Sequence, residues 1–146
     1  MTTLRTLWSK INEPRVVSIA HAYVYLVLTA VCLYALINPP NSIEGAIGDA
    51  AMYLLAGIGA TGAALGTPTA LAGIWWLERT ACAMIMLTSV IYLGVIIGLQ
   101  VTSASDSNRW LQAGFVNAVL VLHFVRWYRV KQRPYDPDRV TMPTQH

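Results

Sequence analysis

The chain has 146 residues, of which 55% are hydrophobic and only 12% are charged, and its formal net charge is +3. Soluble domains carry about 25% charged residues, so this composition excludes an ordinary soluble fold and predicts one small membrane domain. Eight of the ten Lys and Arg residues lie near the two ends of the chain, beside the outermost apolar runs. Anionic lipid headgroups attract such residues, so we expect the lipid bilayer, with its anionic inner leaflet, as a partner and no nucleic acid.

Four apolar stretches predict membrane spans at about residues 16–37, 46–65, 80–101 and 110–127. Each is close to the roughly 20 residues that a helix needs to cross a bilayer. Pro39 and Pro40 end the first stretch, because proline has no amide hydrogen to donate. That stretch is longer than the apolar part of a signal peptide, so we expect it to be retained as an anchor. The predicted fold class is all-α, an integral membrane four-helix bundle.

Three further segments are predicted outside these spans. Residues 3–12 form a short N-terminal interfacial helix, because their apolar side chains recur at helical spacing. Residues 66–79 form a second interfacial segment, with a helix that starts at Pro68 behind a Thr67 cap. For residues 66–77, a re-entrant element or an extension of the third span are the alternatives. The basic tail, residues 131–146, carries three prolines and no apolar periodicity, so we expect it to be disordered.

The distribution of Lys and Arg predicts the orientation of the chain. Nine of these ten residues fall on the side of the membrane that holds both termini, and only Arg109 falls on the other side. Cytoplasmic loops carry the excess of positive charge in membrane proteins. We therefore expect a multi-pass protein of the cytoplasmic (inner) membrane with its N- and C-termini in the cytoplasm.

Small residues are concentrated in the second span, where Gly62 and Gly66 form a GxxxG pattern. Such residues let helices approach closely in lipid, either within the bundle or at an interface between copies of the chain. Asn117, near the middle of the fourth span, is expected to form a hydrogen bond to another helix. The predicted helix-packing residues are Gly57, Gly59, Gly62, Gly66, Gly94, Gly98 and Asn117.

Polar and aromatic residues mark the inner boundary of the membrane. The predicted inner-leaflet polar and anchor residues are His21, Trp75, Trp76, Glu78, Arg79, His123, Arg126 and Trp127. Because His21 and His123 fall at similar depth, a pH-sensitive, proton or metal site is one interpretation. Hydrogen-bonded packing is the favoured one, since no second pair of ligands accompanies them. Cys32 and Cys82 fall at different depths, which predicts buried thiols and no disulfide bond.

No combination of residues predicts catalysis. The chain has no CxxC pair, HExxH motif or phosphate-binding loop, and its predicted loops are too short to hold a base, a nucleophile and an orienting group. We therefore predict that the protein is not an enzyme and has no cofactor. Asp49 is interpreted as a solvated carboxylate at a helix start, with Arg109 as a possible partner. A small multidrug-type transporter is disfavoured, because no carboxylate lies near the middle of a span.

Three short segments support a resemblance to a known group of proteins. They are PPNSIEG (Pro39 to Gly45), GIWWLER (Gly73 to Arg79) and FVRWYRV (Phe124 to Val130). With the four-span layout, they make the chain resemble the small membrane proteins of actinobacterial bacteriophages, some of which are assigned as holin-like or lysis-associated. The resemblance implies a phage-encoded protein that self-associates in the cytoplasmic membrane as a homo-oligomer. Many holins have two or three spans and heavily charged tails, and the chain departs from that pattern.

An alternative function belongs to a different class. A prophage exclusion or immunity protein would hold a cytoplasmic or membrane protein partner at the inner leaflet through its basic ends. Such a protein would leave the host cell healthy, whereas a holin-like protein would damage its membrane.

Overall fold

The computed structural model describes residues 15–102 and 108–131, which contain five helices and no strand. The helices are α2 (Arg15–Ile37), α3 (Asn41–Ile47), α4 (Asp49–Ala72), α5 (Trp75–Thr102) and α6 (Trp110–Lys131). The predicted all-helical class is therefore confirmed for the described residues. The interfacial helix predicted at residues 3–12, and the predicted tail from residue 132 onward, lie outside them.

Three of the helices are long and apolar enough to cross a membrane: α2 from Val16, α4 and α5. Large apolar side chains cover their outer surfaces, among them Leu26, Leu54 and Val90. A surface of this kind is stable in lipid and costly in water. The structure thus supports the prediction of a membrane protein. The helix α6 is less apolar than the other three long helices, and its crossing of the bilayer stays a prediction.

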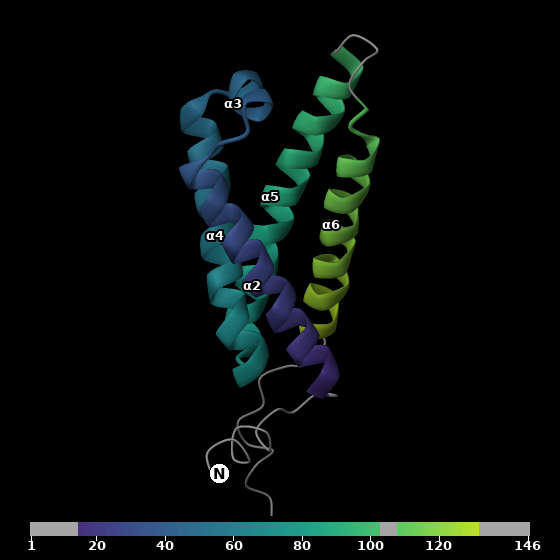
Figure 1. Cartoon of the computed structure of the whole chain (residues 1–146). Helices are drawn as coiled ribbons and strands as arrows, with labels where there is room; N and C mark the ends of the chain where they lie inside the picture. The colour runs from purple at the N-terminus through teal and green to yellow at the C-terminus, as the bar shows by residue number, and fades with distance from the viewer. Residues whose placement is uncertain (1–14, 103–107, 132–146) are drawn as a thin grey trace, which may run out of the picture.

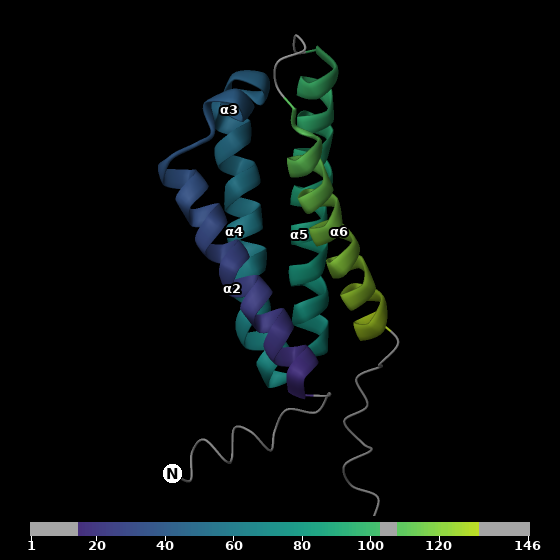
Figure 2. The same cartoon turned by 45° about the vertical axis from the view of Figure 1, so that its right-hand side comes forward.

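The long helices follow one another in space as they do along the chain. α4 packs against α2 on one side and against α5 on the other, and α6 packs against α5. The backbones of α2 and α6 are not in contact. Figure 1 and Figure 2 show α4 and α5 closer together at one end and farther apart at the other, where α3 lies. We refer to these as the closed end and the wide end. α2 begins and α6 finishes at the closed end.

Two groups of buried residues form the core. The group at the closed end comprises Ala22, Tyr25, Ala63, Ala70, Cys82 and Ile85. The group at the wide end comprises Ile43, Met52, Ala56, Ile96 and Ala113. Ile43 comes from α3, so this short helix contributes a side chain to the core at the wide end.

The structure corrects the prediction that a helix starts at Pro68. α4 continues through Pro68 as far as Ala72, and Gly73, with φ of 71°, ends it in the left-handed conformation. Pro68 cannot donate a backbone hydrogen bond, which usually breaks a helix. Hydroxyl groups on either side add hydrogen bonds to carbonyls of the same helix: Thr67 donates to Ala63 O and Thr69 donates to Leu65 O. Such hydroxyl groups allow proline within membrane helices.

The boundaries on both sides of this position also differ from the prediction. Residues 66–79 do not form a separate segment, because they divide between the last turns of α4 and the first turn of α5, which begins at Trp75. Residues 41–47, predicted mostly as loop, form α3. Gly48, with φ of 81°, separates α3 from α4, so the second long helix begins at Asp49.

Candidate functional site: a buried polar cluster at the closed end

Five polar or thiol side chains from three helices meet inside the closed end. They are Tyr25 from α2, Glu78 and Cys82 from α5, and His123 and Arg126 from α6, and each is at most 1% exposed. Residues three or four positions apart lie on the same face of a helix, which places Glu78 with Cys82 and His123 with Arg126. We refer to these five residues as the polar cluster.

An ion pair joins α5 to α6 within the polar cluster. Arg126 donates from Nε to Glu78 Oε1 at 2.7 Å and from Nη2 to Glu78 Oε2 at 3.0 Å. Both side chains are fully buried, and the Trp75 ring centre lies 5.8 Å from the guanidinium carbon. A buried charge is stable only when it is paired and hydrogen-bonded, and this two-bond geometry meets both conditions. The pair carries no net charge.

Tyr25 connects α2 to the two helices that form the ion pair. Its hydroxyl oxygen lies 3.0 Å from Cys82 Sγ on α5. Its ring packs edge-on against the ring of His123 on α6, with the centroids 5.3 Å apart. Since the backbones of α2 and α6 do not touch, this tyrosine bridges them through its side chain. Tyr25 therefore holds α2 against α5 and α6 at the closed end.

The two membrane histidines are both hydrogen-bonded to their own helices. His123 Nδ1 lies 2.8 Å from Val119 O, and His21 Nδ1 lies 3.0 Å from Val17 O. A carbonyl oxygen only accepts, so Nδ1 carries a proton and donates it in both rings. His123 Nε2 is buried and has no hydrogen-bond partner. His21 is half-buried, one turn from Tyr25 on α2.

The remaining predicted anchor residues lie at the rim of the polar cluster. The guanidinium of Arg79 is 5.0 Å from the centre of the Trp127 ring, which is a cation–π contact between α5 and α6. Arg79 and Trp76 are exposed, whereas Trp127 is half-buried. The structure thus brings Glu78, His123 and Arg126 together and leaves Trp76 on the outer surface.

Three of the predicted packing glycines lie where helices approach closely. A methyl group added to Gly62 would lie 2.8 Å from Met84 Cβ on α5, and one added to Gly66 would lie 2.5 Å from the Tyr25 ring. One added to Gly59 would lie 2.9 Å from Cys32 Sγ on α2. This glycine face of α4 therefore packs inside the protein, against α2 and α5.

The other predicted packing residues have open surroundings. Nothing lies within 4 Å of a methyl group built on Gly57, Gly94 or Gly98. Asn117 is exposed on α6, and within the described part of the chain it has no hydrogen bond to another helix. These four positions do not hold the long helices of one chain together.

The polar cluster joins α2, α5 and α6 through side-chain contacts. Both carboxylate oxygens of Glu78 are engaged by Arg126, so no free base is left there. Among the described residues, no group of three or more His, Cys, Asp or Glu side chains is placed to hold a metal ion. Comparison of the chain with protein families, curated proteins and solved structures found no match.

Tyr25 and Cys82 are the members of the cluster that the sequence analysis did not assign to a site. Their positions carried a usable signal: Tyr25 follows His21 by four residues, and Cys82 follows Glu78 by four. That spacing places each beside a predicted polar residue on one helix face.

Proposed function

We propose that the protein is a small, non-enzymatic, holin-like protein that crosses the cytoplasmic membrane four times and self-associates there. Its termini would lie in the cytoplasm, because the closed end, where the described chain begins and ends, also carries Arg79, Arg126 and Arg129. An excess of basic residues marks the cytoplasmic side. Three apolar helices support the membrane location.

The observation that carries self-association is the outward position of Asn117. It lies in the middle of α6 and is exposed on the surface that lipid would cover. An amide without a partner is costly in hydrocarbon, and pairing between helices recovers about 0.6 and up to about 1.7 kcal/mol. Because an amide both donates and accepts, the same residue of a second copy is a suitable partner. Gly114, one turn away, has open space beside it and permits close approach.

This places the proposed association surface on α6 rather than on the glycine face of α4. Gly59, Gly62 and Gly66 already contact side chains of the same chain, so that face is occupied. Among the described helices, none covers the outward face of α6 around Gly114 and Asn117. A holin-like lesion would then grow by lateral contacts between α6 helices of neighbouring copies.

Induced expression of the protein alone in a bacterial host tests the proposal. We expect loss of membrane potential and viability, together with crosslinked dimers and higher oligomers in isolated membranes. Asn117→Leu should delay the loss and reduce the crosslinked fraction. Thr61→Val is the matched control, because it also removes an exposed polar group but from α4, where the hydroxyl bonds its own helix.

Two other outcomes would contradict the proposed holin-like function or its association surface. Healthy cells that resist phage infection would favour the alternative, an exclusion or immunity protein that binds a partner at the inner leaflet. The exposed Arg79, held against Trp127, is a surface that such a partner could contact. An oligomer ladder unchanged by Asn117→Leu would show that α6 is not the association surface.

A further inference from the structure

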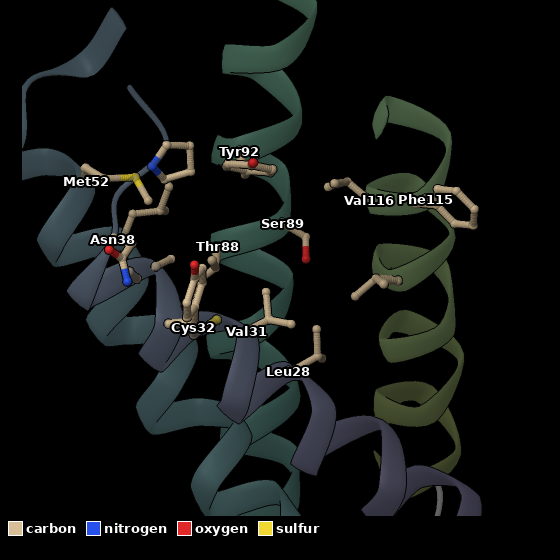
Figure 3. A pocket seen from close by; sticks show the side chains of 16 residues that line it. Leu28, Val31, Cys32, Asn38, Met52, Thr88, Ser89, Tyr92, Phe115 and Val116 are labelled. Atoms are coloured by element: carbon tan, nitrogen blue, oxygen red, sulfur yellow. The ribbon is translucent and has the colours of Figure 1, made fainter. Parts of the chain in front are cut away.

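We propose that a cavity toward the wide end binds one acyl chain of a bilayer glycerophospholipid, with the lipid phosphate at Arg109. The cavity has a volume of about 370 Å³ and lies between α2, α4, α5 and α6 (Figure 3). Its apolar walls include Leu28, Val31, Leu55, Phe115, Val116 and Val119. The cavity wall on α6 lies next to the proposed association surface but does not include Gly114 or Asn117.

The cavity exists because α2 and α6 separate above the polar cluster. Tyr25 joins these two helices through its contact with His123 at the closed end. Farther along α2, Leu28 and Val31 face Val116 of α6 across open space (Figure 3), and Val119 also lines the cavity. The backbones of α2 and α6 make no contact that would fill this space. The surrounding bilayer is therefore the nearest source of apolar groups to occupy it.

Polar side chains lie at different depths along the cavity, and these depths correspond to the polar parts of a phospholipid molecule. Tyr92 lies nearest the wide end, and its hydroxyl accepts a hydrogen bond from Gln112 Nε2 at 2.8 Å. One turn deeper, Ser89 is 7% exposed and points into the space between α5 and α6 (Figure 3). Thr88 Oγ1, at the same depth, is buried without a hydrogen-bond partner. The Ser89 hydroxyl at this depth suits an ester carbonyl group of a lipid, with apolar walls below it for the chain, whereas Thr88 packs against Gly59 of α4.

Arg109 supplies a positive charge at the wide end. Its Nη1 atom is buried without a hydrogen-bond partner, and within the described residues it forms no ion pair with a carboxylate. The backbone amide of Arg109 donates a hydrogen bond to Gln100 Oε1 at 2.6 Å, which holds the residue beside the last turns of α5 at the wide end. A guanidinium group matches the geometry and charge of a phosphate. Arg109 as a whole is half-buried, so its charge can attract the phosphate of a lipid whose chain enters the cavity.

The lining of the cavity suits an acyl chain. Its side chains come from all four long helices, and most of them are apolar. A flexible hydrocarbon chain can follow an irregular apolar space of this kind and bury its own apolar surface there.

The test uses the full chain in phosphatidylglycerol vesicles that contain an analogue with a diazirine group in its acyl chain. After illumination, mass spectrometry locates the labelled residues. We expect labels to concentrate on the cavity walls of α2 and α6. Val116→Phe, which fills the cavity, should lower this labelling at least fivefold, and Arg109→Gln should lower it severalfold. The matched control is Val121→Phe, on the exposed outer face of the same helix, which should leave it unchanged.

A second variant keeps the proposal testable if Val116→Phe does not fold. Val31→Phe fills the cavity from the opposite wall, where the side chain is 58% exposed and has room to change. Labels spread evenly over outer and cavity residues, or unaffected by both filling variants, would overturn the proposal. Crosslinks between two protein chains at Val116 would overturn it as well, by assigning the cavity to a second copy.

Discussion

Glu78→Gln should destabilise the protein by about 3–5 kcal/mol, because it removes the carboxylate that pairs with the buried Arg126 guanidinium. Both side chains are fully buried, and two hydrogen bonds of 2.7 and 3.0 Å join them. At about 1.36 kcal/mol for each factor of ten, this loss lowers the folding equilibrium constant by roughly 150- to 5,000-fold. The size of the effect reflects the cost of leaving the buried Arg126 charge without this carboxylate rather than the strength of the pair.

Unfolding in increasing SDS, followed by tryptophan fluorescence and far-UV circular dichroism, measures this loss. Glu44→Gln is the matched control: Glu44 is half-buried in α3 and has no ion pair among the described residues. Its substitution should change the free energy of unfolding by less than about 0.5 kcal/mol. The reasoning is refuted if Glu78→Gln and Glu44→Gln shift the transition equally.

The double substitution Glu78→Leu/Arg126→Met separates the charge effect from the packing effect. Replacing a buried ion pair by apolar side chains is often neutral or stabilising by about 1–4 kcal/mol. We therefore expect the double variant to recover most of the stability that Glu78→Gln loses. A double variant as unstable as the single one would mean that packing geometry, and not an isolated charge, sets the cost.

Further predictions concern the glycine face of α4 and the thiols. Gly66→Ala should lower the free energy of unfolding by about 1–3 kcal/mol, because the added methyl group meets the Tyr25 ring. Gly57→Ala, with open space beside it, should leave the free energy of unfolding unchanged or raise it by up to about 1 kcal/mol. Equal SDS transitions for the two variants would contradict this prediction. Tyr25→Phe, which keeps the ring but removes the hydroxyl beside Cys82, should cost about 0.5–1.5 kcal/mol in the same assay. A membrane-permeant maleimide should label the half-buried Cys32 faster than the fully buried Cys82, as measured by intact mass. The reverse order of labelling would exclude the described packing of α2, α4 and α5.

The sequence was sufficient to predict the all-helical fold class and the approximate positions of the long helices. Apolar runs that are long enough to span a membrane have few other stable structures. It was less informative about helix ends. α4 continues through Pro68 with hydroxyl hydrogen bonds from Thr67 and Thr69 beside it, and such bonds depend on side-chain rotamers that a residue pattern does not specify. The short helix α3 carries little periodic signal, and Gly48 alone separates it from α4.

The polar cluster was predictable in position but not in pairing. The sequence predicts that His21 and His123 lie at similar depth and that Glu78 lies at the same boundary, but depth is a one-dimensional measure. That Glu78 pairs with Arg126 rather than with its neighbour Arg79 depends on the rotation of α5 about its axis, because adjacent residues on a helix do not face each other. The cavity depends on the angles at which helices cross, and no residue pattern encodes those directly.

The contact between Glu78 and Arg126 also constrains how the chain is synthesised and inserted. The two residues are 48 positions apart, so the ribosome releases Glu78 well before its counter-charge exists. If α5 entered the hydrocarbon alone, it would carry an unneutralised carboxylate. The translocon should therefore retain α5 at its lateral exit until α6 emerges, and the two helices should enter the lipid together as a hairpin.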